Sequence, residues 1–231
     1  MNYDNINFTI LEVYKKFNIH SFPLNCFEIL KLCGMKVKKY SEQNPQKKTQ
    51  CLLYSDDAFK LKNTIYYNDN KPVGRTRFSL AHELGHIILG HSNSNLEIQE
   101  KEADVFASHI LAPRIAIHYS RCKNQNDVAK IFYMSQEAAQ YAFDDYRRWH
   151  RRTVIHKMKE LDKAMYDHFY NNDAECFVYK IHLCAYCGTE IYNSDSHVCP
   201  LCSAPNNKSI CNSDPGLDFM MAESQWLYGG L

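Results

Sequence analysis

The segment 76–91 constrains the fold most, because it contains two histidines four residues apart, His82 and His86, with Glu83 between them. On a helix, residues four apart lie about 40° apart around the axis and one turn along it. The two imidazoles can therefore hold one metal ion and leave positions for a third ligand and a water molecule. Glu83 lies on the flank of that face, where its carboxylate can act on the water instead of binding the metal.

The residues around this motif indicate that it lies on a helix. Gly90 stands where a helix would end, and apolar residues recur at three- and four-residue spacing before it. These apolar residues are Phe78, Ala81, Leu84, Ile87 and Ile88. Zinc lowers the pKa of its water to about 7, so a carboxylate base at position 83 can complete the deprotonation at neutral pH. The alternative is a chance match on a helix that binds no metal.

A second helix, predicted over 97–112 and ended by Pro113, supplies acidic side chains. Glu100 and Asp104 share one face, so Glu100 is the expected third ligand. Asp104 is expected to accept the second N–H of a ligating histidine and to fix its tautomer. Glu102 lies about 200° around the axis from Glu100 and is expected in solvent. The alternative for Glu100 is an exposed helix carboxylate without a ligand role.

The residues before the motif predict two helices and a small sheet. An amphipathic helix is expected over 4–18, and a second one from Pro23 to Cys33. Short β-prone runs follow at 37–40, 51–54 and 64–67 and predict a small antiparallel sheet. Its edge strand can pair with an extended peptide substrate. A sheet that serves only as a scaffold is an equally open reading.

Three stretches together resemble the ImmA/IrrE family of zinc metallopeptidases, namely Arg77–His91, Glu100–Ala107 and Leu111–Pro113. The resemblance covers residues 20–150 and implies an α+β, zincin-like peptidase domain. It implies zinc on His82, His86 and Glu100, with Glu83 as general base. It also implies a protein substrate, such as a helix-turn-helix repressor of transcription. It does not assign the residue that polarises the scissile carbonyl, and the candidates are Tyr67, Arg75, His109, His118 and Tyr119.

Residues 126–149 have the pattern of a helix-turn-helix, with Ser135 as the expected N-cap of the second helix. The exposed start of that helix offers Gln136, Glu137 and Gln140, and none of them is a cation for phosphate. This composition favours packing within a peptidase domain of residues 1–150 over DNA contact. The basic cluster 147–152 opens a helical stretch predicted to continue to Phe169, with 151–170 as a connecting helix. It is read as a solvated face, with an acidic partner or nucleic acid as the alternative.

The C-terminal part contains two C-x-x-C pairs separated by eleven residues. The four cysteines are Cys184, Cys187, Cys199 and Cys202. This spacing predicts a zinc ribbon over 171–212, with four thiolates around one structural zinc. A thiol-disulfide pair is the alternative, but it would not require the second C-x-x-C. His182 and His197 lie nearby, although four thiolates leave them no position. The apolar tail, 213–231, is expected to dock on a domain. Binding to a partner is the alternative.

Composition restricts the function classes. A net charge of +1 gives no general attraction to nucleic acid or anionic membranes. No signal peptide or long apolar run is evident, and the six other cysteines are scattered singly, so a cytoplasmic protein without a membrane partner is expected. The sequence predicts an endopeptidase with one catalytic and one structural zinc. The alternatives are a metal-bound regulator without catalysis, which would not need Glu83, and a DNA-binding regulator, which the neutral charge disfavours.

Overall fold

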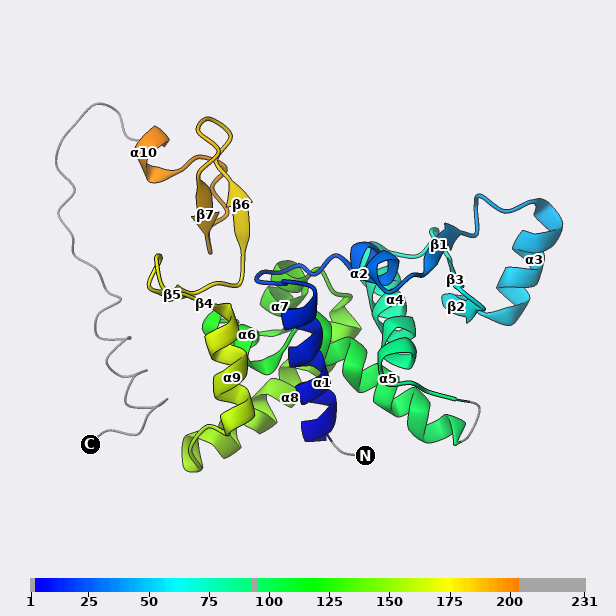
Figure 1. Ribbon diagram of the computed structural model, residues 1–231, viewed down its shortest axis with the longest axis horizontal. Helices are drawn as coiled ribbons and strands as arrows, with labels where there is room; N and C mark the ends of the chain where they lie inside the picture. Colours follow the sequence, from blue (N-terminus) through cyan, green and yellow to red (C-terminus); the bar gives the residue numbers. More distant parts are fainter. Residues whose placement is uncertain (1–2, 93–94, 204–231) are drawn as a thin grey trace.

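Helices α4 (Val73–Ile88) and α5 (Leu96–Leu111) cross closely in the middle of the main body (Figure 1). A Cβ atom on Gly85 would lie 3.1 Å from Cδ1 of Phe106 and 3.2 Å from Cα of Ala103, so glycine permits this close approach. The contact places the acidic side chains of α5 opposite the two histidines of α4. The computed structural model describes residues 3–92 and 95–203.

The described residues contain eight further helices. They are α1 (Tyr3–Lys16), α2 (Cys26–Leu32), α3 (Pro45–Tyr54), α6 (Arg114–Tyr119), α7 (Gln125–Phe132), α8 (Gln136–Ile155), α9 (Glu160–Phe169) and α10 (Pro200–Ser203). Large side chains from α1, α5 and α7, among them Tyr14, Phe106 and Phe132, are fully buried in one continuous core. The hydroxyl of Tyr14 donates to the carbonyl of Ile110 at 2.7 Å, which ties α1 to α5. Burial of this apolar surface is the main force that holds the two metal-site helices together.

The predicted α+β class is confirmed, but the sheet differs from the expected antiparallel one. Its strands are β1 (Lys36–Lys39), β2 (Ala58–Leu61) and β3 (Thr64–Tyr67), in the order β1-β3-β2. Strand β1 runs parallel to β3, and only β2 is antiparallel to it. The strand predicted at 51–54 is wrong, because these residues end helix α3. Asn44 caps that helix by accepting from the Lys47 N–H at 2.8 Å, and Pro45 occupies its first turn.

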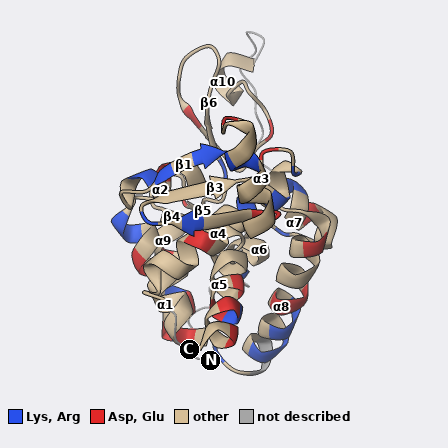
Figure 2. Ribbon diagram, turned by 90° about the vertical axis from the view of Figure 1, so that its right-hand side faces the viewer, with Lys and Arg blue, Asp and Glu red and all other residues tan. Residues whose placement is uncertain are grey.

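The two edges of this sheet differ in character. Three of the four residues of β1 are lysines, and Figure 2 shows this basic strand at the sheet edge. Edge lysines discourage pairing with another strand. Strand β2 is the opposite edge and packs beside α4. The edge next to the metal-site helix is therefore the one suited to pairing.

The predicted helix-turn-helix is present as α7 and α8, and it packs into the main core through Val128, Phe132 and Ala139. Ser135 caps α8 as expected, accepting from the Ala138 N–H at 3.2 Å. The turn also lies against the start of α4, since a Cβ on Gly74 would lie 2.4 Å from the backbone nitrogen of Ser135. These two helices therefore support the metal-site helix.

The single helical stretch predicted to Phe169 is interrupted. Helix α8 ends at Ile155, and α9 begins at Glu160. The chain folds back there, and the indole N–H of Trp149 donates to the Asp162 carboxylate at 3.0 Å. Phe169 is buried in the main core, so α9 is part of the body rather than a free connector.

The C-terminal part of the described chain contains four short strands. They are β4 (Tyr170–Asn171), β5 (Cys176–Phe177), β6 (Ile181–Leu183) and β7 (Glu190–Tyr192). Strand β4 pairs with β5, and β6 pairs with β7. Phe177 packs in the main core, whereas Cys184, Ile191 and Cys199 form a separate small cluster. This cluster lies in the lobe of β6, β7 and α10 that projects from the body in Figure 1.

Some expectations concern residues beyond the described ranges. The last part of the predicted ribbon, 204–212, and the tail 213–231 lie outside the described residues. Within the described ranges, no helix combines the length and apolar character needed to cross a bilayer.

Candidate metal centres and active site

Three side chains predicted as ligands converge between α4 and α5. The Nε2 atoms of His82 and His86 lie 3.0 Å apart. One oxygen of Glu100 lies 3.2 Å from Nε2 of His82, and the other lies 3.4 Å from Nε2 of His86. Tetrahedral zinc, with bonds of about 2.0–2.1 Å to nitrogen and oxygen, keeps such atoms about 3.3–3.4 Å apart. The donor set therefore fits zinc in both kind and spacing.

Asp104 holds the first of these histidines. Its carboxylate lies 2.9 Å from Nδ1 of His82, one helical turn beyond Glu100 on α5. Burial opposes protonation of His82, but the carboxylates of Asp104, Glu83 and Glu100 outweigh it and raise the pKa of this imidazole. A hydrogen bond at Nδ1 leaves the Nε2 lone pair free for a metal. The expected position of Asp104 behind His82 is thus found in the structure.

Glu83 lies on the flank of the same centre. Burial raises the pKa of its carboxyl above the ordinary range, although the charge of His82 partly offsets the shift. The backbone N–H of Lys60, on the edge strand β2, acts to lower the pKa of this carboxyl and also offsets part of the shift. A carboxyl with a raised pKa is better suited to take up and release a proton near neutral pH. Glu83 thus has the raised proton affinity that suits a general base.

Three of the five candidates for polarising the substrate carbonyl have other partners. Tyr67 is buried in the main core. Arg75 forms a two-pronged ion pair with Asp57, at 2.6 and 2.9 Å. The ring of Tyr119 stacks on that of Phe177. Each of these interactions supports the fold around the site.

The two histidine candidates also lie in structural contacts. Nε2 of His109 lies 3.1 Å from the carboxylate of Asp145, in the interior between α5 and α8. His118 lies 3.2 Å from the hydroxyl of Tyr146, and burial lowers the pKa of its imidazole to about 4. A histidine that is neutral across the physiological range fits a packed interior.

Lys60 is a cation at the centre that the sequence did not single out. Its positive charge lowers the pKa of both Glu83 and His86. Its side chain is exposed on β2, so it can reach a bound substrate. The sequence does not predict strand β2, which carries Lys60, because the stronger β-prone run lies at 51–54. A correct strand assignment would have provided the signal, since strand residues alternate between the two faces of a sheet.

The four C-terminal cysteines form the second cluster. Their sulfur atoms all lie within 4.8 Å of one another, and Cys187 Sγ lies 3.6 Å from Cys199 Sγ. Tetrahedral zinc, with Zn–S bonds of about 2.3 Å, needs about 3.8 Å between sulfurs. Backbone N–H groups, including that of Cys199 at 3.3 Å, lower the pKa of the Cys184 thiol to about 6. This cluster can bind a metal through thiolates. His182 instead contacts the Ser196 carbonyl oxygen at 2.6 Å.

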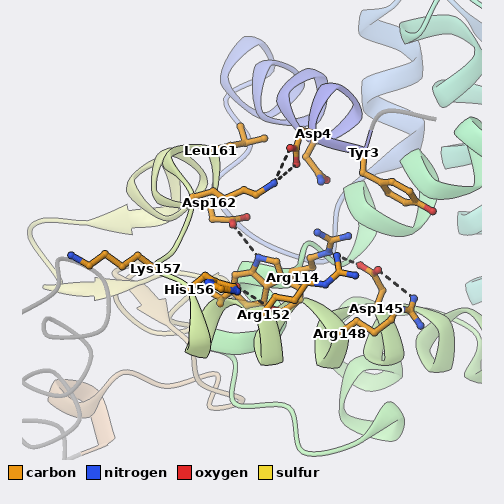
Figure 3. A pocket seen from close by; sticks show the side chains of 14 residues that line it. Tyr3, Asp4, Arg114, Asp145, Arg148, Arg152, His156, Lys157, Leu161 and Asp162 are labelled. Atoms are coloured by element: carbon orange, nitrogen blue, oxygen red, sulfur yellow. Dashed lines mark hydrogen bonds and ion pairs between the residues drawn. The ribbon is translucent and has the colours of Figure 1, made fainter.

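A cavity of about 670 Å³ lies apart from both clusters, between α1, α8 and α9 (Figure 3). Arg148 and Arg152, from the basic cluster 147–152, line it. Asp145 pairs there with Arg114 and also with Arg148, at 3.4 Å. Figure 3 shows these side chains around the opening. Asp145 therefore neutralises part of the basic cluster.

The comparisons with known proteins agree with this geometry. Residues 34–144 match the family model Peptidase_M78, described as the IrrE N-terminal-like domain. The match is shorter at both ends than the resemblance over 20–150, but it contains the convergent residues of α4 and α5. No curated protein and no solved structure matches the chain. Residues 34–144 are therefore similar to the IrrE N-terminal-like domain of this peptidase family, and a cluster of four cysteines follows them.

Proposed function

We propose that this protein is a zinc-dependent endopeptidase that hydrolyses a peptide bond in a protein substrate. His82, His86 and Glu100 would hold the catalytic zinc. The observation that carries the proposal is the convergence of these three ligands, at 3.0–3.4 Å, beside the partly buried carboxyl of Glu83. Zinc binding alone does not require a carboxylate at position 83, so its placement supports hydrolysis over binding.

When bound, zinc would act as a Lewis acid toward the attacking water and the scissile carbonyl. Glu83 accepts the proton of the attacking water and passes it to the nitrogen of the leaving amine. The raised pKa of its carboxyl makes the carboxylate a stronger base toward the proton of the water. Asp104 keeps the His82 ring in orientation through the 2.9 Å contact at Nδ1.

The substrate is proposed to bind as an extended segment along β2. This strand is a sheet edge, and both the backbone N–H and the charge of Lys60 on it influence the pKa of Glu83. A peptide added at this edge would form main-chain hydrogen bonds directly beside the catalytic carboxylate. The proposed substrate class, a helix-turn-helix repressor, rests on the likeness to the ImmA/IrrE peptidases.

The cysteine cluster is proposed to hold a structural zinc. All four positions of a tetrahedral ion would be filled by Cys184, Cys187, Cys199 and Cys202, which leaves no position for water or substrate. The role of the ribbon is then folding and recognition rather than chemistry.

A cleavage assay tests the proposed activity. The purified protein is incubated with the helix-turn-helix repressor encoded beside it, and the products are identified by mass spectrometry. We expect one defined cut, which disappears when a chelator removes the more weakly held metal and returns when zinc is added. Cleavage that persists unchanged in the metal-stripped protein would contradict a metallopeptidase.

A further inference from the structure

The end of helix α4 brings a third histidine to the metal centre. Gly90 has a φ of 67° and donates from its N–H to the Ile87 carbonyl at 3.3 Å. The N–H of His91 donates to the carbonyl of His86 at 3.0 Å. These two bonds form a Schellman motif, in which the second residue after the cap folds back beside the third residue from the helix end. The glycine thus places His91 next to His86.

The two rings meet through their Nδ1 atoms, which lie 2.9 Å apart. Only one of the two atoms can carry the proton in this contact. If His86 carries it, the Nε2 lone pair of His86 is free to face His82 and Glu100. If His91 carries it, His86 must be protonated at Nε2, and that tautomer cannot bind a metal there. The contact therefore couples the tautomer of His91 to the ligand capacity of His86.

Glu102 favours the binding tautomer. Its carboxylate lies 3.4 Å from Nε2 of His91, and the His91 side chain is only 7% exposed. This Nε2 atom is buried without a well-formed hydrogen bond to any described residue, and the Glu102 oxygen faces it as an acceptor for its proton. A proton on Nε2 leaves Nδ1 of His91 as an acceptor for His86. The side chain of Glu102 is 26% exposed, so the expectation that it lies in solvent is wrong.

We propose that His91 and Glu102 are positioning residues that hold His86 in the tautomer able to bind metal through Nε2. Each ligand histidine then has a carboxylate behind it, with Asp104 acting directly on His82 and Glu102 acting on His86 through His91. Such outer partners raise ligand basicity and fix the ring orientation. This proposal rests on the metal centre proposed above.

Glu102 acts on His86 through His91, and we call this chain of contacts the relay. Zinc affinity at the centre tests it. The full chain, with the ribbon metal in place, is titrated with zinc against a chromophoric chelator. His91→Phe keeps a ring but removes the acceptor, so we expect about 10–100-fold weaker zinc binding. His91→Asn presents an oxygen near the position of Nδ1 and should stay close to the parent. His156→Phe, at an exposed histidine outside the centre, should bind zinc as the parent does.

Two further measurements separate positioning from packing. Thermal unfolding without metal at the centre should differ little between His91→Phe and His91→Asn. In ¹⁵N-histidine spectra of the same metal-free protein, His86 should be protonated at Nδ1, and Glu102→Gln should shift it toward the other tautomer.

Two results would overturn the relay alone. One is parent-like zinc affinity in His91→Phe, and the other is equal loss of affinity in the Phe and Asn variants, which would indicate packing. Absence of zinc from the centre of the parent protein would instead refute the metal centre itself, and the relay with it.

Discussion

The variant Glu83→Gln is expected to lose peptide hydrolysis by a factor of about 10²–10⁴ while it retains zinc. Glutamine keeps the size of the side chain and a polar group near the Lys60 N–H, but it cannot accept the proton of water. The ligands His82, His86 and Glu100 are untouched, so the metal content and the melting temperature should stay close to the parent's. Initial cleavage rates and metal analysis on the same preparation provide the measurement.

Glu97→Gln is the matched control for this experiment. Its side chain lies at the start of α5, is 82% exposed and pairs at the surface with Lys101. The same chemical change there should leave turnover and zinc unaltered. In cells, Glu83→Gln should leave the cognate repressor uncut and its genes silent. Derepression as strong as the parent's would mean that the protein acts by binding and not by hydrolysis.

The variant Cys199→Ser should unfold the cysteine lobe and leave the metal-site helices folded. The Cys199 sulfur is buried in a cluster too small to be stable alone, with Ile191 and Cys184 as its buried neighbours. In zinc-finger peptides, structural zinc contributes about 10–16 kcal/mol, so losing a thiolate removes most of what holds such a module. Hydrogen exchange should rise across 181–203, and the exchange of α4 and α5 should change little.

Cys33→Ser is the control for the loss of a thiol, because Cys33 is a free, partly exposed cysteine at the end of α2. It should leave exchange in the lobe unchanged. Faster exchange across the whole chain in Cys199→Ser would show that the lobe and the main core are one cooperative unit.

The parts of the fold that the sequence predicts well are those with strong local periodicity. The helix of the H-E-x-x-H motif and the acidic helix after it each have a continuous apolar stripe, and α4 and α5 follow them closely. The sheet was predicted less well because local preferences conflicted. Residues 51–54 are β-prone, yet the Asn44 cap and Pro45 begin a helix that continues through them. Such a crossover is what allows β1 and β3 to run parallel.

The same distinction holds for the site. His82, Glu83, His86, Glu100 and Asp104 were predicted from spacing on single helices, and the structure brings them together. Lys60, His91 and Glu102 were missed as site residues because their roles depend on how elements meet. The helical angle of Glu102 gives its direction from α5, but it does not show that the end of α4 folds back to meet it. Contacts between elements require the tertiary structure.

The zinc content of the purified protein tests the central claim most directly. The full chain, prepared without chelator, should contain two zinc ions, and His86→Ala should contain one. In the parent, the ion at His82, His86 and Glu100 should leave first under a chelator, because two imidazoles and a carboxylate with open access hold zinc less firmly than four thiolates. A single zinc in the parent, unaffected by His86→Ala and lost in Cys199→Ser, would contradict the metallopeptidase.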